Sequence, residues 1–233
     1  YTAIDNPELY FQVKAYTGDG EASHAITLDG DEDMQPDLVW IKPRDETYNH
    51  RIFDAVRGAT KVIYSNLTNG EGTSTGSLSA FGTDGFTLGD EPWENEDGGN
   101  FVAWCWKANG SGSSNTAGSI NTTATSANTT SGFSIVTWTG DEGSSATLGH
   151  GLGAVPKMII TKGRTYASSW ATYHHKITAD YWLQMCETDA AADVATIWND
   201  TEPTSTLFTV GSSNQVNDDY NYVAYVFAEK QGF

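Results

Sequence analysis

Short apolar runs alternate with polar residues along most of the chain, and few stretches show the period of a helix. Residues 11–16 point alternately to two faces, and β-branched and aromatic runs at 38–41 and 158–160 follow a proline. Turn sequences rich in glycine, asparagine and aspartate separate such runs by about 8 to 15 residues. This rhythm predicts an all-β protein whose antiparallel sheets form a sandwich or a jelly roll.

Two runs are apolar on both alternating faces. Residues 101–106 read Phe-Val-Ala-Trp-Cys-Trp, and residues 222–227 read Tyr-Val-Ala-Tyr-Val-Phe. Such density is typical of a central strand that is covered on both sides, so both runs are predicted to be central and buried. Cys105 shares a face with Phe101, which predicts a buried apolar residue, and Cys186 is expected to behave in the same way.

Four blocks of sequence recur in the same order about 120 residues later, which favours a tandem duplication of one β unit. The matching blocks are 11–19 with 133–141, 36–44 with 156–164, 85–89 with 207–211, and 100–106 with 221–227. The predicted organisation is an N-terminal arm at 1–10, a first β repeat at 11–110, a linker at 111–131 and a second β repeat at 132–233.

The segments outside the repeats differ in character. The linker carries no charged residue, and its Ser- and Thr-rich composition favours a flexible chain, although part of 119–125 could instead pair with a sheet edge. The arm is more apolar than a free tail requires, so we expect it to dock on this chain or on a neighbour, with Tyr1 and Ile4 as candidate contact residues. Residues 188–195 predict at most a short helix.

The charge of the chain restricts its partners. Thirty Asp and Glu residues outnumber 12 Lys and Arg residues, which gives a formal net charge of −18. Such a surface repels phosphate backbones and anionic lipids, so neither nucleic acid nor a membrane is expected as a partner. With two cysteines and no apolar run of about 18 residues, the sequence predicts a soluble chain, made in a reducing cytoplasm or freed of a leader.

The sequence carries no strong catalytic or metal-binding motif. The acidic loop 29–33 offers oxygen ligands of the kind that Ca²⁺ prefers but lacks the spacing of an EF-hand, so a solvated loop is expected. Motifs for a serine nucleophile, a zinc protease or a phosphate loop are absent. A carboxylate pair for glycoside hydrolysis stays open, because an acid-rich chain always offers one. We expect no enzyme, no cofactor, no metal and no catalytic residues.

Aromatic residues are the better candidates for binding. The chain has 8 Trp and 11 Tyr residues, most of which follow the strand pattern and are expected in the core. Trp93, Trp170 and Trp198 lie in loop-like surroundings instead. Exposed aromatic rings stack on sugars and anchor protein interfaces, so these three are predicted surface contact residues.

Several strings of residues are specific when taken together. They include Tyr-Thr-Ala-Ile-Asp-Asn-Pro at 1–7, Pro-Asp-Leu-Val-Trp-Ile-Lys at 36–42, Phe-Asp-Ala-Val-Arg-Gly-Ala-Thr-Lys at 53–61 and Gly-His-Gly-Leu-Gly at 149–153. Nearly the whole chain resembles a domain of uncharacterised function that recurs in virion proteins of tailed bacteriophages, many of them marine. The resemblance implies a structural or adhesive part of a phage particle and brings no catalytic residues with it.

Three classes of function follow from the residues and the resemblance together. The first is a tail fibre or tail-associated adhesin that contacts the host surface, the second a capsid decoration or cement protein, and the third a carbohydrate-active enzyme. Expected partners are other virion proteins, further copies of the chain in a homo-oligomer, with a trimer favoured, and a host-surface glycan. The expected location is the virion, assembled in the bacterial cytoplasm.

Overall fold

The computed structural model describes residues 2–232 and is built almost entirely of β-strands. Across these residues the strands form sheets of six, seven, three and two strands, and every pairing between named strands is antiparallel. Helical structure is confined to the turns η1 (Pro7–Leu9), α1 (Pro92–Asn95) and α2 (Ala195–Trp198). The prediction of an all-β sandwich fold is confirmed.

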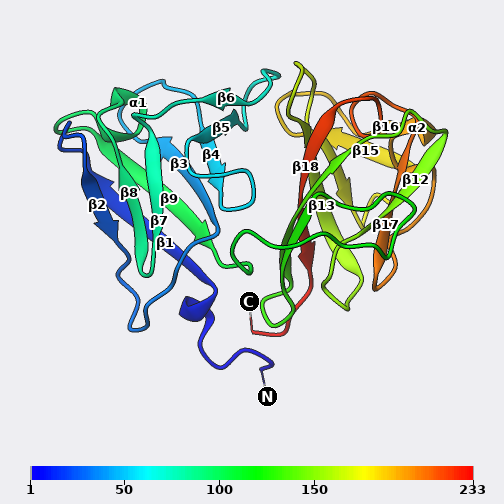
Figure 1. Ribbon diagram of the computed structural model, residues 1–233, viewed down its shortest axis with the longest axis horizontal. Coiled ribbons are helices and arrows are strands. Elements are labelled where there is room, and N and C mark those ends of the chain that lie inside the picture. The colour runs from blue at the N-terminus through cyan, green and yellow to red at the C-terminus, as the bar shows by residue number, and fades with distance from the viewer. Residues whose placement is uncertain (1, 233) are drawn as a thin grey trace.

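The first unit consists of a large sheet and a small one (Figure 1). The large sheet has the strand order β1-β9-β3-β4-β5-β6, and the small one β2-β8-β7. Their bounds are β1 Phe11–Thr17, β2 His24–Thr27, β3 Leu38–Pro43, β4 Arg51–Asp54, β5 Lys61–Tyr64, β6 Gly72–Thr73, β7 Leu78–Gly82, β8 Gly85–Leu88 and β9 Asn100–Trp106.

The second unit has a similar plan. Its large sheet has the order β10-β11-β18-β13-β14-β15-β16, and β12 pairs with β17 in a small sheet. The bounds are β10 Ala124–Asn128, β11 Phe133–Thr139, β12 Ser145–Gly149, β13 Pro156–Gly163, β14 Ala171–His174, β15 Tyr181–Gln184, β16 Ala192–Asp193, β17 Leu207–Gly211 and β18 Asn221–Ala228. Strands β11-β18-β13-β14-β15-β16 therefore stand in the order of β1-β9-β3-β4-β5-β6, and a duplication of the sequence remains the prediction that would explain this likeness.

The four sheets lie in layers, with the two large sheets facing one another in the middle and a small sheet on each outer side (Figure 1). Each unit has its own core between its large and small sheets. Strand β9 sends Phe101 and Cys105 into the first core, and β18 sends Tyr222 and Val226 into the second. Their other faces look toward the opposite unit, which explains why both runs are apolar on both sides.

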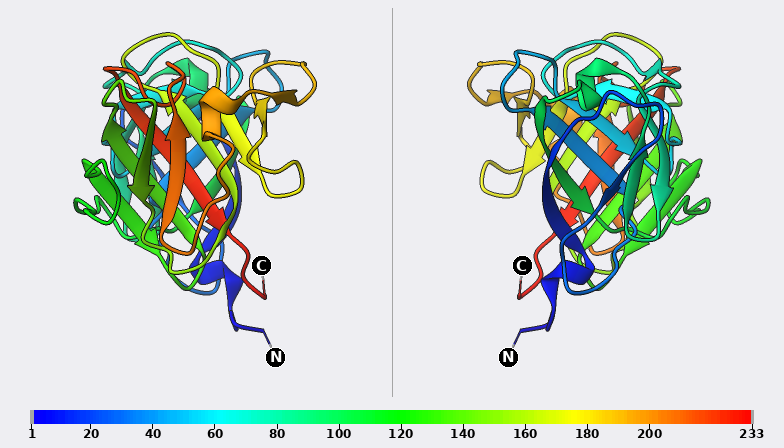
Figure 2. Two further views of the ribbon diagram at one scale, coloured as in Figure 1. Left: turned by 90° about the vertical axis from the view of Figure 1, so that its right-hand side faces the viewer. Right: turned by 90° about the vertical axis from the view of Figure 1, so that its left-hand side faces the viewer.

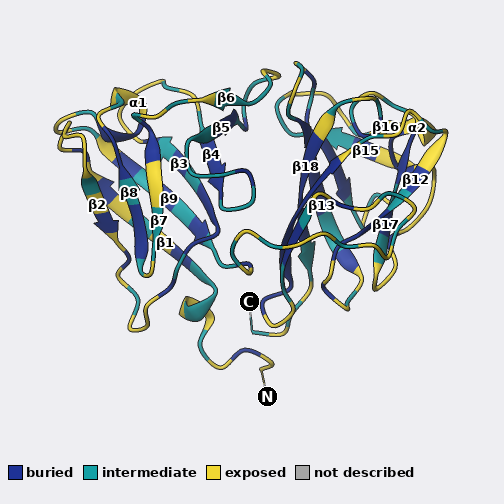
Figure 3. Ribbon diagram, viewed as in Figure 1, coloured by how far each residue is buried: buried dark blue, intermediate teal, exposed yellow. Residues whose placement is uncertain are grey.

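A third apolar cluster joins the two units, and buried residues accordingly line the strands that face each other (Figure 3). It brings Leu38, Ile52 and Ile63 of the first unit against residues such as Ile160 and Val223 of the second. Both dense runs are central, since β9 lies between β1 and β3 and β18 between β11 and β13. Their predicted position is confirmed, although Trp104 and Trp106 are only half-buried.

Hydrogen bonds, several of them from charged side chains, reinforce this joint between the units. The Trp170 indole N–H donates to the carbonyl of Tyr64 at 2.9 Å. Arg164 donates from two nitrogens to both carboxylate oxygens of Glu71, at 2.9 and 3.1 Å. The Lys162 ammonium is buried and donates to the carbonyls of Thr68 and Ser168 at 3.1 and 2.9 Å. Directional bonds thus fix the orientation in which the apolar faces meet.

The segment that connects the two units is ordered against the second unit. Strand β10 pairs with β11 along its whole length, and Ser113 forms an isolated bridge with Thr125. The pairing with a sheet edge that its threonines allowed is therefore present, although most of it lies C-terminal to 119–125. The expectation of a flexible linker does not describe this segment.

The N-terminal arm folds back on its own chain, so that the two ends of the described chain lie close together (Figure 2). The amides of Ala3 and Ile4 both donate to the carbonyl of Gln231, at 2.8 and 3.3 Å. Ile4 is only 3% exposed. Of the two expected docking places, this chain and a neighbour, the structure shows the first.

Candidate functional site

The first unit carries an open pocket at the end of its large sheet. The loop before β4, the start of β4, the end of β5 and helix α1 converge there around a cavity of about 370 Å³. Its lining residues are Thr47, Tyr48, Asn49, Arg51, Tyr64 and Trp93. Three aromatic rings stand beside the polar side chains of Thr47, Asn49 and Arg51, so this concave surface offers a small ligand both stacking and hydrogen bonds.

Two aromatic side chains meet on one wall of this pocket. Helix α1 begins at Pro92, whose fixed backbone angle suits the first position of a helix, and Trp93 follows it with 39% of its surface exposed. The ring of Tyr48 meets that of Trp93 edge to face, with centroids 4.8 Å apart. Burial and the nearby Glu96 and Glu46 raise the pKa of Tyr48, so this wall carries a neutral phenol.

Arg51 forms the floor of the pocket. Its Nη1 donates to a carboxylate oxygen of Glu94 at 2.8 Å and to the hydroxyl of Ser77 at 3.1 Å. The guanidinium carbon lies 5.4 Å from the ring centre of Tyr64 and 5.5 Å from that of Trp93, within range of a cation–π interaction. Its Nε is buried and has no hydrogen-bond partner.

Glu94 lies behind Arg51 and away from the solvent. Its side chain is 1% exposed, and one of its carboxylate oxygens has no partner. Burial raises the pKa of Glu94 to about 7, an effect that the charge of Arg51 only partly offsets. Glu94 therefore holds Arg51 from below without lining the pocket.

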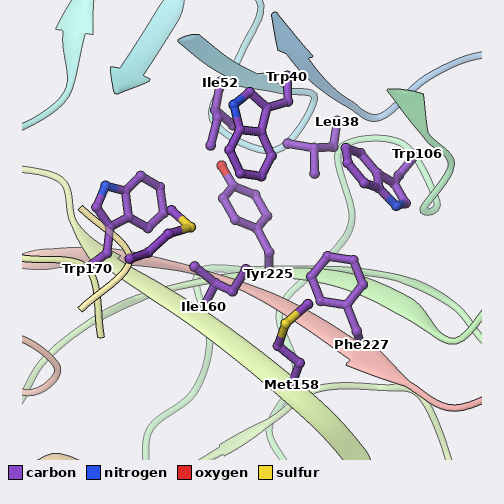
Figure 4. Close-up of a pocket in the computed structure, with 10 residues that line it drawn as sticks. Leu38, Trp40, Ile52, Trp106, Met158, Ile160, Trp170, Tyr225 and Phe227 are labelled. Atoms are coloured by element: carbon purple, nitrogen blue, oxygen red, sulfur yellow. The ribbon is translucent and has the colours of Figure 1, made fainter. Parts of the chain in front are cut away.

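A second cavity of about 270 Å³ lies in the joint between the units (Figure 4). No polar atom lines it, because the hydroxyl of Tyr225 donates to Asp54 at 2.7 Å and the indole N–H of Trp170 is bonded to Tyr64. Its lining residues are Leu38, Trp40, Ile52, Trp106, Met158, Ile160, Trp170, Met185, Tyr225 and Phe227. It offers apolar contact without any group that could orient a ligand.

The three tryptophans predicted from the sequence as surface contacts differ in their exposure. Trp93 lies at the surface, in the pocket described above. Trp170 is 0% exposed, because it inserts into the joint between the units and stacks near Tyr225. Trp198 is 2% exposed, because α2 packs it against Tyr173 in the second core. The prediction of surface contact was wrong for both.

Of the two arm residues predicted as surface contacts, the structure describes only Ile4. Ile4 is buried against its own chain near Gly232, so its predicted surface contact was wrong. Tyr1 lies outside the described residues.

Sequence reasoning missed most of the pocket. Tyr48, Arg51 and Tyr64 come from three different segments, and only the pairing of Arg51 with Tyr64 across β4 and β5 brings two of them together. The recurring blocks gave no signal for it, because none of them includes a residue that lines the pocket.

Among the described residues no group of three or more His, Cys, Asp or Glu side chains could hold a metal ion. Asp29 of the acidic loop forms an ion pair with Lys14 instead. No helix in residues 2–232 is long and apolar enough to span a membrane.

Together the fold and the pocket define an all-β protein of two packed sandwich units, with an aromatic surface pocket on one of them. The chain belongs to the family described as "Domain of unknown function (DUF7483)", whose model matches residues 6–233. No curated protein matches the chain, and no solved structure does.

Proposed function

We propose that the chain is a structural attachment protein of a tailed-phage particle, a tail fibre or tail-associated adhesin that binds a glycan of the host surface. One observation carries the binding part of this proposal: the pocket of the first unit exposes Trp93 beside Tyr48. Rigid aromatic rings with one face exposed to solvent lose little entropy on binding, and that face suits the apolar face of a sugar ring. The phage part rests on the resemblance of the sequence motifs.

The chemistry of the pocket supports binding rather than cleavage. Glycoside hydrolysis uses two carboxyl groups on either side of the scissile bond. None of the six lining residues carries a carboxyl group, and Glu94 lies buried behind Arg51. We therefore propose a non-catalytic attachment protein.

A role as a capsid decoration protein has less support. This role depends on an apolar arm that binds a neighbouring subunit, but the structure buries Ile4 of that arm within its own chain. An assembly of several copies, with a trimer favoured, remains part of the proposal, because virion parts repeat by symmetry.

Labelling the chain in intact particles tests the location. Antibody-bound particles viewed by electron microscopy should carry the label on the tail, and light scattering of the purified chain should show an oligomer. A label spread over the capsid lattice would contradict the adhesin and favour the decoration protein.

A further inference from the structure

A buried ion pair distinguishes the first unit from the second. Arg51 and Glu94 lie at positions where the second unit has Ala171 and Val216, both 0% exposed and both part of its core. The register supports the first correspondence, since Arg51 pairs with Ile41 as Ala171 pairs with Thr161.

Hydrogen bonds support the second correspondence. Tyr16 donates its hydroxyl to the carbonyl of Glu94 at 2.9 Å, and Trp138 donates its indole N–H to the carbonyl of Val216 at 3.2 Å. The next residue repeats as well. The side-chain oxygen of Asn95 accepts a hydrogen bond from the Asp19 backbone N–H, and its side-chain NH₂ donates to the Asp19 carboxylate. Asn217 makes the same two bonds with Asp141. Glu94 and Val216 thus occupy matching places.

The sandwich does not need this ion pair. In the second unit an alanine and a valine fill the same places, and a buried ion pair loses so much hydration that apolar residues often serve stability equally well. Its distinct effect in the first unit is to hold a guanidinium between the rings of Tyr64 and Trp93, at the floor of the open pocket.

The surrounding charges restrict the ligand. Glu94 compensates Arg51, Glu46 and Glu96 lie close to Tyr48, and the whole chain carries a formal charge of −18. An anionic sugar would meet repulsion here, whereas a neutral ring with hydroxyl groups would not.

We propose that this pocket binds a neutral pyranose sugar, which stacks on Trp93 and accepts hydrogen bonds from Arg51, and that Glu94 positions Arg51 for this contact. The inference rests on the proposed glycan binding and specifies its ligand class. The proposed contacts are stacking and hydrogen bonds from a guanidinium already held in place, so we expect binding without a metal ion.

The decisive variant gives the first unit the two residues that the second unit has at the matching positions. Arg51→Ala combined with Glu94→Val reproduces the pair Ala171 and Val216, so it keeps the core apolar while it removes the guanidinium. Binding is measured at pH 8, where Glu94 is ionised, with neutral polysaccharides (a glucan, a galactan and a mannan) and with polygalacturonate as the acidic counterpart. We expect binding to a neutral polysaccharide, in the presence of a chelator, and a loss of about tenfold or more in the double variant.

Two further variants complete the design. Trp93→Ala should lose binding to a similar extent, and since its side chain is exposed it should fold normally. Tyr181→Ala removes a ring of nearly equal exposure, 40%, from the second unit and should bind like the wild type.

The outcomes separate the inference from the proposed function. If Trp93→Ala loses binding and the double variant does not, the role of the ion pair is wrong while the glycan-binding pocket stands. A preference for polygalacturonate would overturn the neutral ligand alone. If no polysaccharide binds, the sugar site is refuted, and the particle labelling still tests attachment to the tail.

Discussion

At the scale of single residues, Arg51 and Glu94 place two opposite charges in a buried position, where each compensates the other. Removing one partner of a buried ion pair leaves an uncompensated charge away from water, which costs about 3–5 kcal/mol. Replacing both by apolar residues of the kind seen at Ala171 and Val216 removes the problem.

The stability of the single and double variants should therefore be far from additive. Arg51→Ala and Glu94→Val should each lower the free energy of unfolding by about 3 kcal/mol or more, and the combined variant should stay within about 1 kcal/mol of the wild type. Urea unfolding of the four proteins at pH 8 measures this. Additive losses would show that the two side chains do not act as a pair.

The pKa of Glu94 leads to a pH dependence with a definite sign. Burial raises this pKa to about 7 from the ordinary 4.5, despite Arg51. The folded state thus holds a proton that the unfolded state has released, so stability from this group is complete below pH 4.5 and is lost as pH rises through 7.

Glu94→Gln should remove this dependence, because glutamine stays neutral throughout. The difference in unfolding free energy between Glu94→Gln and the wild type should shift in favour of the variant by up to about 3 kcal/mol between pH 4.5 and pH 8. Urea titrations at several pH values measure it, with Glu46→Gln as an exposed control. A constant difference across this range would contradict the raised pKa.

At the scale of elements, the loop between β5 and β6 and the loop between β13 and β14 hold the units together. Lys162 bonds to both loops, through Thr68 and Ser168, and burial lowers its pKa to about 8 from 10.5. Between these values the unfolded state binds more protons, so the contribution of Lys162 to stability rises with pH.

Replacement of this lysine should therefore change the pH profile as well as the baseline. Lys162→Met should lose the rise in stability between pH 8 and 10.5 that the wild type shows, on the order of 3 kcal/mol. Thermal unfolding across this range measures it, and Lys157→Met provides a control on the neighbouring part of β13. Parallel profiles for wild type and Lys162→Met would rule out the buried ammonium as the cause.

The sequence was most informative about the positions of the strands. Alternation and turn residues predicted the sheets and the central position of 101–106 and 222–227, because local pattern and strand burial coincide there. Trp170 and Trp198 were misplaced, because their surroundings look like loops in the sequence. Only packing between the units buries Trp170, and only the packing of α2 against Tyr173 in the second core buries Trp198. The pocket escaped prediction since its residues meet only through strand pairing and a four-residue helix.

At the scale of the whole molecule, the two large sheets are buried on both faces only while the units stay together. The apolar cluster between them includes Leu38, Ile52 and Ile63 on one side and Val223 and Tyr225 on the other. Separation would expose these residues to water at about 25 cal/mol for each Å² of apolar surface.

Each unit should therefore be less stable alone than within the full chain. Residues 1–110 and 111–233, produced separately, should bind a hydrophobic dye and melt below the full chain, whereas the full chain should unfold in one transition. Mixing the two halves should restore the melting temperature, as calorimetry can show. Two well-separated transitions in the full chain would mean that the joint contributes little.

The apolar cavity in the joint has a mechanical consequence. Its walls offer water no polar partner, so this partly open space of about 270 Å³ is poorly filled in the folded chain. Unfolding eliminates poorly filled space and so lowers the volume of the system, and hydrostatic pressure favours the state of smaller volume. Compression should consequently destabilise the joint between the two halves most, and because the chain unfolds in one transition, both halves should unfold together with it.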